Sequence, residues 1–155
     1  MAQAKFYYKD PAAPRPNRPN HIGVAVLLEW QGRYLMEYRA DSDFWCFIGG
    51  GLWIDETLAR CAQRETREET GICLPETGFQ FVRLYDDPSR IAAYPDGNVL
   101  RVITALYRVA MAEEPALVCS EESRALRFFA PQELAGLPVA PTHRDILGDI
   151  LAGRV

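Results

Sequence analysis

The fold is constrained most by residues 56–70, a segment that contains neither proline nor glycine and is rich in Ala, Leu, Glu, Arg and Gln. These residues have high helix propensity, and Gly71 directly after them is a favourable C-terminal cap. Three consecutive glycines, Gly49 to Gly51, lie in the apolar run that precedes the segment. Glycine adopts unusual backbone angles and allows close approach of a ligand. The sequence therefore predicts a helix over 56–70 that follows a glycine-rich turn.

Short apolar segments on both sides of this helix predict a β-sheet. They are rich in β-branched, aromatic and aliphatic residues and are separated by turns, which is the pattern of strands. The expected strands are residues 21–30, 34–39, 79–85, 98–110 and 125–130, and two further helices are expected at 131–137 and 142–152. Strands and helices are mixed, and the first two strands read as a hairpin. This order favours an α+β fold or a mixed α/β/α sandwich over a doubly wound parallel sheet.

The composition is that of an ordinary globular domain. The chain has 155 residues, of which 48% are hydrophobic, and a formal net charge of −4. We expect one domain at residues 21–155, after a proline-rich N-terminal arm at residues 1–20. The acidic balance argues against a protein that coats nucleic acid or an anionic membrane. No membrane span or secretory signal is expected, and the scattered cysteines favour a reducing cytoplasm.

Three glutamates crowd one face of the predicted helix. Glu65, Glu68 and Glu69 are spaced i, i+3 and i+4, which places their side chains together. Like charges at this spacing destabilise a helix by a few tenths of a kcal/mol per pair, so the face meets either open water or a cation. Carboxylates together with a carbonyl from the glycine turn are the hard oxygen ligands that Mg²⁺ or Mn²⁺ prefers. The cluster indicates either a solvated charged face or a metal site suited to phosphate chemistry.

The same segment resembles the signature of the Nudix hydrolases, G-x5-E-x7-R-E-U-x-E-E-x-G-U, in which U is a bulky aliphatic residue. The seven fixed positions are matched by Gly50, Glu56, Arg64, Glu65, Glu68, Glu69 and Gly71. Each such residue has a background frequency of roughly 6–7%, so a chance match is on the order of one in a million. The resemblance implies a Nudix-like α/β/α sandwich with a mixed sheet, in which this box forms a loop-helix-loop unit beside the sheet.

The chain departs from the family pattern at three positions. Thr66 replaces an aliphatic residue, Ile48 stands where a proline is common, and Trp53 stands where many members have an acidic residue. No metal-binding position of the box is lost, so the resemblance implies an active enzyme. It also suggests that Trp53 widens an aromatic wall beside the site.

The resemblance implies an enzyme that hydrolyses the pyrophosphate bond of a nucleoside diphosphate derivative with Mg²⁺ or Mn²⁺. The implied metal-binding residues are Glu65, Glu68, Glu69, Glu56 and the carbonyl of Gly49 or Gly50. For Glu56, a structural role that caps the loop-helix unit is the preferred interpretation.

Two further catalytic roles follow from the resemblance. Arg64 would orient a glutamate of the box through charge-assisted hydrogen bonds. The catalytic base would be a carboxylate of a later loop, for which Glu122 is preferred over Glu121, or Glu65 of the box itself.

Phosphates need cationic partners and a nucleobase needs a flat one. The candidate substrate-binding residues are Arg39, Arg90, Arg101, Phe44, Trp53 and Tyr85, with Arg83 and Tyr94 as further candidates. Pro88 lies 16 residues beyond the end of the box at Ile72. A proline at that spacing resembles the ADP-ribose pyrophosphatases of the family.

The expected substrate is therefore a small molecule, ADP-ribose or a nucleotide sugar. The alternatives are a (d)NTP, the 5′ end of an RNA, or binding without turnover in a nucleotide-sensing module. An RNA partner is disfavoured because the chain is acidic and has no lysine cluster. Family habit and the N-terminal arm are compatible with a homodimer.

Overall fold

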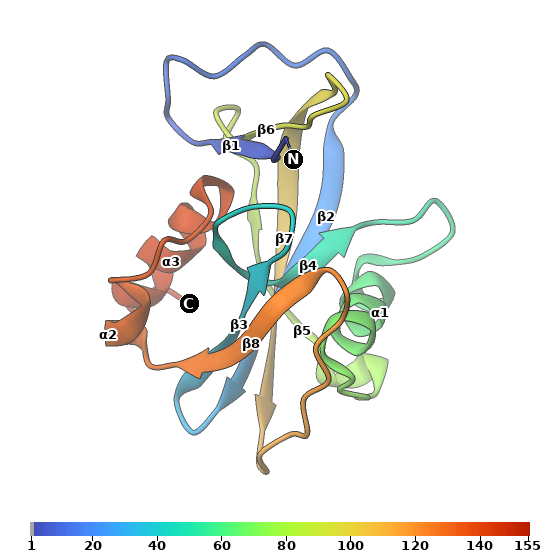
Figure 1. Ribbon diagram of the computed structural model, residues 1–155. Coiled ribbons are helices and arrows are strands. Elements are labelled where there is room, and N and C mark those ends of the chain that lie inside the picture. Colours follow the sequence, from blue (N-terminus) through green and yellow to red (C-terminus); the bar gives the residue numbers. More distant parts are fainter. Residues whose placement is uncertain (1) are drawn as a thin grey trace.

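The computed structural model describes residues 2–155, which form a mixed sheet with helices on both faces (Figure 1). The strands are β1 (Lys5–Tyr7), β2 (His21–Trp30), β3 (Arg33–Arg39), β4 (Trp45–Gly51), β5 (Gln80–Tyr85), β6 (Ile91–Ala93), β7 (Val99–Met111) and β8 (Ser123–Phe129). The helices are α1 (Leu58–Thr70), α2 (Pro131–Leu134) and α3 (Arg144–Leu151), with 3₁₀ turns η1 (Glu76–Gly78) and η2 (Pro141–His143). The strand order is β1-β6-β7-β2-β4-β3-β8, and β5 also pairs with β7.

Strand β2 lies in the middle of the sheet and organises both cores. It pairs in parallel with β7 over its whole length and antiparallel with β4. A strand in such a position is covered on both faces, which explains its continuous apolar run. Because successive side chains alternate, Val24, Val26 and Leu28 enter one core while Ala25 and Leu27 enter the other.

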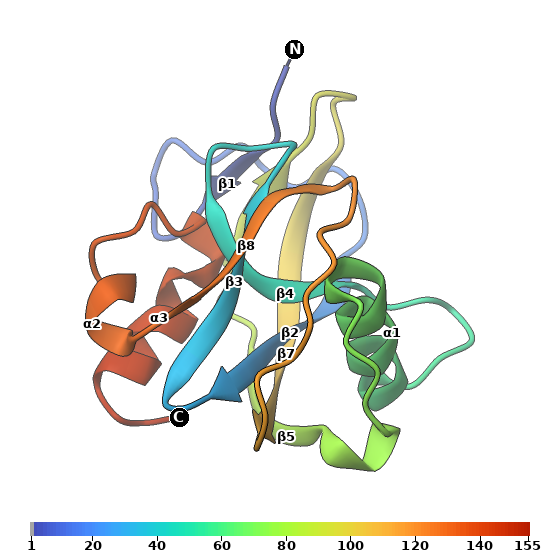
Figure 2. The same cartoon turned by 60° about the horizontal axis from the view of Figure 1, so that its bottom comes forward.

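The two cores define the three layers of the fold. The first contains Cys61 and Ala62 of α1, and the second contains Leu134 of α2 and Ile146 of α3. Figures 1 and 2 both show α1 on one side of the sheet and the pair α2 and α3 on the other. The predicted α/β/α sandwich with a mixed sheet is confirmed.

Helix α1 begins two residues later than predicted and ends where predicted. Thr57 is the N-cap, and its Oγ1 accepts a hydrogen bond from the amide of Arg60 at 3.2 Å. Gly71 ends the helix with a left-handed φ of 76°, and its amide donates to the carbonyl of Arg67. Glu56 belongs to the preceding loop, where its carboxylate accepts the amide of Trp53 at 2.9 Å. The capping of the helix itself therefore falls to Thr57.

The proline-rich arm lies on the body of the domain. Its strand β1 pairs antiparallel with β6, and Asn17 forms hydrogen bonds to the backbone of Gly97 and Val99. Strand β6 falls inside the segment that the sequence predicted as a loop, residues 86–97. Strands β1 and β6 are three residues each, too short for an alternating pattern to appear in the sequence.

The remaining predicted elements occur with shifts at their ends. The fifth predicted strand begins two residues earlier, at Ser123, and the last helix is preceded by η2 rather than starting at residue 142. Among residues 2–155, no helix has both the length and the apolar character needed to cross a bilayer. The four cysteines are unpaired thiols.

Thr66 is predicted to cost stability. Its side chain is fully buried in α1, and its Oγ1 has no hydrogen-bond partner among residues 2–155. A buried hydroxyl without a partner is destabilising, so Thr66→Val should raise the free energy of unfolding by about 1 kcal/mol in chemical denaturation. Thr70→Val is the matched control, since the buried Thr70 hydroxyl donates to the Thr66 carbonyl at 2.6 Å and must lower stability when removed. A lower stability for Thr66→Val would contradict the assignment.

His143 is predicted to make stability depend on pH. Its Nδ1 accepts the amide of Phe47 at 3.1 Å, and burial together with Arg90 and Arg39 lowers its pKa from 6.5 to about 3. Between these values the unfolded chain takes up a proton that the folded chain does not, so the unfolding free energy should fall as the pH falls. In His143→Gln this part of the slope should disappear, while both proteins should respond alike above pH 7. Equal slopes over the whole range would refute the prediction.

Candidate active site

The glutamate face of α1 meets the glycine turn of β4 in a cleft of about 680 Å³. Its lining combines the box and the glycine turn with four other parts of the chain, namely the start of β2, β3, the loop after β6, and the loop before β8. The lining residues are His21, Arg39, Gly49, Gly50, Gly51, Trp53, Arg64, Glu65, Glu68, Glu69, Tyr94, Ser120, Glu121 and Glu122. The structure thus brings together most of the residues predicted as metal-binding or catalytic.

The glycines of β4 allow the glutamates to lie against the strand. A Cβ added at Gly50 would come within 2.4 Å of a carboxylate oxygen of Glu65. A Cβ at Gly49 would lie 2.0 Å from the carbonyl oxygen of Val24 on the neighbouring strand. The amide of Gly49 also donates to Oε2 of Glu69 at 3.0 Å. A side chain at either glycine would push β4 away from α1 or from β2.

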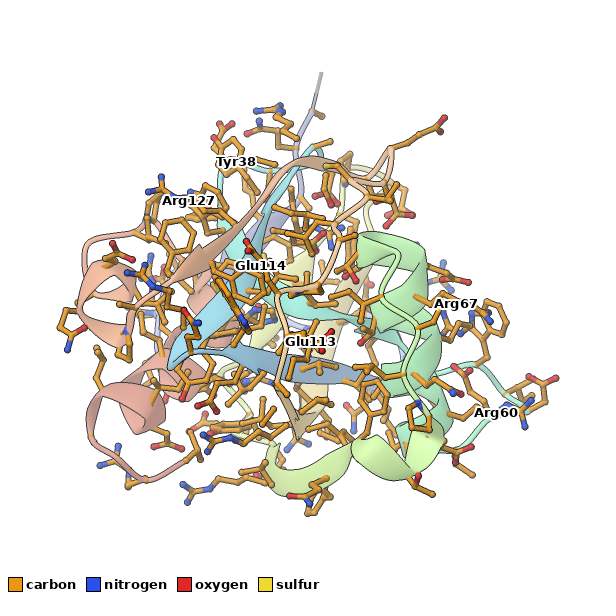
Figure 3. The ribbon with its side chains drawn as sticks, turned by 90° about the horizontal axis from the view of Figure 1, so that it is seen from below. Tyr38, Arg60, Arg67, Glu113, Glu114 and Arg127 are labelled. Atoms are coloured by element: carbon orange, nitrogen blue, oxygen red, sulfur yellow. The ribbon has the colours of Figure 1, made fainter. Side chains whose placement is uncertain are left out.

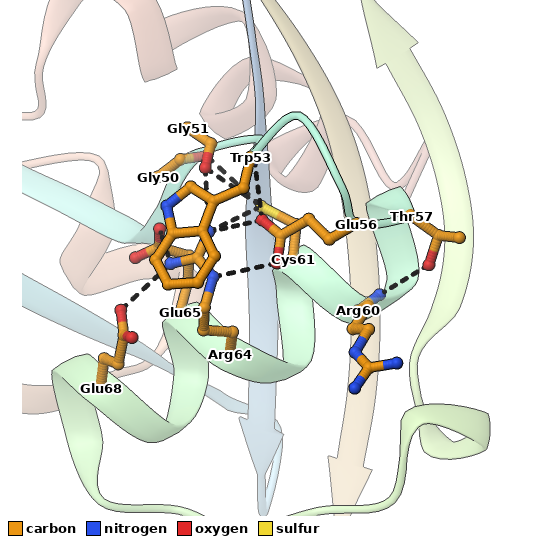
Figure 4. Close-up of polar contacts among 10 residues, drawn as sticks. All are labelled: Gly50, Gly51, Trp53, Glu56, Thr57, Arg60, Cys61, Arg64, Glu65 and Glu68. Carbon is orange, nitrogen blue, oxygen red and sulfur yellow. Dashed lines mark hydrogen bonds and ion pairs between the residues drawn. The ribbon is translucent and has the colours of Figure 1, made fainter.

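Arg64 connects the carboxylates of the box (Figure 4). Its guanidinium donates to both oxygens of Glu56, at 2.6 and 3.0 Å, and to the carbonyl of Gly51 at 3.0 Å. Its Nη1 also donates to Glu65 at 2.7 Å and to Glu68 at 3.1 Å. These bonds from Arg64 lower the pKa of Glu56 to about 2. Glu56 is therefore a partner of Arg64 that fixes the loop before α1.

Trp53 covers this arginine. Its ring stacks on the guanidinium, with 3.8 Å between the Arg64 Cζ and the ring centroid, and the tryptophan stays 55% exposed. Such cation–π stacking favours the charged form and keeps water away from one face of the guanidinium. Trp53, which stands where the Nudix pattern often has an acidic residue, thus places an aromatic ring over Arg64.

Buried negative charge collects beneath the cleft. Burial raises the pKa of Glu65 in spite of Arg64, and burial together with Glu37 raises the pKa of Glu69 well above its usual range. Glu37 on β3 is itself buried, accepts a hydrogen bond from the Ser123 hydroxyl at 2.6 Å, and has a pKa raised by its burial. Sequence reasoning missed Glu37, because a glutamate within a strand gives no local sign of facing a distant helix.

The chemistry of this donor set fits a hard divalent cation. Among residues 2–155, no three His, Cys, Asp or Glu side chains are already grouped so that they could hold a metal ion. Arg64 engages Glu65 and Glu68 instead. Nevertheless, Glu65 and Glu69 are both largely buried at the cleft, and the charge of Glu65 adds to the cost of ionising Glu69. A bound cation would stabilise both carboxylates.

Arg39 and Glu122 also reach the cleft. Arg39 forms two bonds of 2.7 Å to Asp41 and a longer one of 3.4 Å to Glu37, so it is held in a fixed position at the wall. Glu122 lies in the loop before β8, whose backbone is tied to Ala40 by a 2.8 Å hydrogen bond. Both residues come from outside the box, and the fold brings them to the cleft that the glutamates of α1 line.

Four predicted substrate residues do not line the cleft: Arg90, Arg101, Phe44 and Tyr85. Arg90 has no exposed surface and forms an ion pair with Asp145 at 2.9 Å. Tyr85 is buried, and its hydroxyl donates to Asp149 at 2.6 Å.

Arg101 donates to the carbonyl of Asp86, and Phe44 packs edge-on against Phe6 with 6.4 Å between the rings. The sequence could not separate these residues from Arg39, because the difference lies in contacts between segments far apart in the chain. Arg83 is likewise outside the cleft and pairs with Asp149.

Two histidines near the site were not anticipated. His21 lines the cleft, and a Cβ at Gly51 would lie 2.8 Å from its Cε1. His143 lines a smaller cavity that shares residues with the cleft. Neither position carries a local motif, so no signal in the sequence could have found them.

The chain matches a known family over most of its length. The family described as "NUDIX domain" matches residues 18–150. The RNA pyrophosphohydrolase of Xanthomonas oryzae pv. oryzae (strain MAFF 311018) is 42% identical over 67 residues, which are 43% of this chain and 30% of that protein. The match therefore spans less than a third of the length of these relatives.

Solved structures share the fold. The bifunctional NMN adenylyltransferase/ADP ribose pyrophosphatase of Francisella tularensis, complexed with AMP and a Mn ion, aligns with a TM-score of 0.70 and 22% identity over 90% of this chain and 43% of that one. The NUDIX domain of Shewanella oneidensis NrtR, complexed with ADP ribose, aligns with a TM-score of 0.69 and 17% identity over 94% of both chains. The residues of the box meet in one cleft, and the family model matches most of the chain. The chain therefore belongs to the Nudix family.

Proposed function

We propose that this protein is a metal-dependent pyrophosphohydrolase that cleaves a nucleoside diphosphate derivative. The observation that carries the proposal is the cleft in which Glu65, Glu68 and Glu69 face the glycine turn while Arg64 links the box. A solvated charged face, the alternative interpretation of these glutamates, does not require two of them to be mostly buried. The geometry therefore supports a cation site.

Glu65, Glu68 and Glu69 would hold Mg²⁺ or Mn²⁺, together with a carbonyl of the glycine turn. When bound, such an ion neutralises phosphate charge and lowers the pKa of water. Two contacts within the chain would orient the ligands for this chemistry. The Gly49 amide orients Glu69, and Arg64 orients Glu65. Glu56 holds Arg64 rather than the ion.

Glu65 and Glu122 are the candidates for the catalytic base. Glu65 lines the cleft from α1, beside the glycine turn. Glu122 lines the same cleft from the loop before β8 and would accept a proton there. Arg39, fixed by Asp41, would bind a phosphate group of the substrate.

A small nucleotide, ADP-ribose or a nucleotide sugar, is the preferred substrate class, with a (d)NTP as the alternative. The similarity to RNA pyrophosphohydrolases favours an RNA 5′ end as a second candidate. However, Arg39 and Arg64 are the only arginines that line the cleft among residues 2–155, and no lysine joins them. A strand of RNA would need a longer basic track. Location in the cytoplasm and a homodimer stay predictions.

Glu69→Gln should reduce hydrolysis by on the order of 100-fold or more, because a neutral amide keeps the contact with Gly49 but removes a metal ligand. The measurement is release of a nucleoside monophosphate from ADP-ribose, nucleotide sugars, dNTPs and triphosphorylated RNA with Mg²⁺ or Mn²⁺. Glu114→Gln is the matched control, since Glu114 is exposed in the connection from β7 to β8 (Figure 3). Full turnover by Glu69→Gln would exclude the proposed metal site.

Arg64→Lys should lower both activity, by about 10-fold or more, and the melting temperature. Lysine retains the charge but cannot bond three carboxylates and a carbonyl from one planar group. Arg67→Lys provides the comparison, because Arg67 lies on the exposed side of the same helix (Figure 3). Equal behaviour of the two variants in thermal unfolding and in the hydrolysis assay would show that Arg64 does not organise the site.

A further inference from the structure

Glu37 of β3 is a buried carboxylate that stability does not explain. Its side chain is only 1% exposed. One of its oxygens accepts the Ser123 hydroxyl at 2.6 Å, and the other has a 3.4 Å contact with Arg39, whose shorter bonds go to Asp41. A carboxylate that is taken out of water and bonded so sparsely costs stability, and an apolar side chain of similar volume would destabilise the fold less. Its presence here points to a function.

Alternation along β3 places Glu37 on the side of the sheet that α1 covers. Leu35, two residues earlier, packs in the core that contains the apolar residues of α1, and Arg39, two residues later, lines the cleft. Glu37 therefore lies between this core and the cleft, next to the arginine to which the proposed function assigns a phosphate group.

A β-bulge in β8 turns Ser123 toward Glu37. Leu126 of β8 is paired with Glu37, and in a regular strand a residue three positions earlier would face the opposite side of the sheet. The bulge shifts the register, so that Ser123 rather than Arg124 lies opposite Arg39. The shift brings the Ser123 hydroxyl to the Glu37 carboxylate at the start of β8, where the loop that lines the cleft ends.

The bond between Ser123 and Glu37 anchors the loop that carries Glu122, a candidate for the catalytic base. The Glu122 carbonyl accepts the amide of Ala40, directly after β3, at 2.8 Å. The loop is thus held to β3 twice, through its backbone and through the side chain that follows Glu122. The negative charge of Glu122 also contributes to the raised pKa of Glu37, which places the two carboxylates near one another.

We propose that Glu37 is a positioning residue of the pyrophosphohydrolase, which holds the loop of Glu122 and the side chain of Arg39 where the reaction needs them. This role rests on the proposed function, which assigns a proton acceptor and a phosphate-binding group to these two residues. Glu37 acts through its hydrogen bonds and does not touch the substrate. Its bond with Ser123 serves the chemical step, whereas its contact with Arg39 serves substrate binding.

Removal of both bonded groups separates this role from a structural one. In Glu37→Leu/Ser123→Ala neither member of the pair is left as a buried polar group without its partner. The melting temperature should equal or exceed that of the wild type, while kcat with whichever substrate the wild type hydrolyses should fall by about 10-fold or more and KM should rise about 3-fold. Arg127→Gln, which changes an exposed charge on the same strand, is the matched control and should leave all three values unchanged (Figure 3).

Two single variants divide the effect. Ser123→Ala should lower kcat by about 10-fold with KM within about 2-fold of the wild type, because Arg39 keeps its contacts. Glu37→Gln should stay within about 3-fold of the wild type in both constants, because its amide can accept from Arg39 and donate to the Ser123 hydroxyl. Full activity of the double variant, a change in KM alone for Ser123→Ala, or a Glu37→Gln enzyme as impaired as the double variant would overturn the proposal.

Hydrogen exchange separates failure of this role from failure of the proposed function. The Ala40 amide, whose acceptor is the Glu122 carbonyl, should exchange about 10-fold faster in Ser123→Ala than in the wild type and Arg127→Gln. Faster exchange in a protein that hydrolyses nothing would support the anchor of the loop and reject the pyrophosphohydrolase. Unchanged exchange would overturn the anchor even if hydrolysis is found.

Discussion

The bonds of one guanidinium hold the candidate site together. Arg64 ties the loop before α1, through Glu56, to the helix face that carries Glu65 and Glu68, and it also binds the end of β4 at Gly51. The guanidinium thereby compensates charges that would otherwise repel one another in a half-buried place. The same arginine leaves Glu69 without a cationic neighbour in the box. Arg64 thus compensates Glu65 and Glu68 in this structure, whereas Glu69 is the buried box carboxylate that it does not reach.

The glycines and the central strand place this assembly on the sheet. Gly49 packs directly against Val24 of β2, while Gly50 gives space to the Glu65 carboxylate. Because β2 also pairs with β7, residues of both strands line the smaller cavity beside the cleft, namely Gly23, Val24, Val102 and Thr104. The loop-helix-loop box therefore supplies the carboxylates of the cleft, whereas the two central strands supply part of the wall of the smaller cavity.

Features that depend on residues close together in the chain could be predicted from the sequence. The helix, its end at Gly71 and the grouping of Glu65, Glu68 and Glu69 follow from spacing along 23 residues, and so does membership of the family. Contacts between distant segments could not be predicted. Arg39 and Arg90 look alike in the sequence, yet one lines the cleft and the other is sealed in the core. Three-residue strands such as β1 and β6 have no pattern of their own and form through pairing, β1 with β6 and β6 with β7.

The parallel pairing of β2 and β7 has a consequence for how the chain folds during synthesis. The two strands are joined over ten register positions, although about 80 residues separate them along the chain. Until residue 111 leaves the ribosome, the most apolar strand of the domain lacks one of its two central neighbours. Contacts of such long sequence separation slow folding and leave strand edges open to other chains. The nascent protein therefore has an unpaired strand edge, the condition that favours aggregation, at a stage when the glutamates of α1 have already been made.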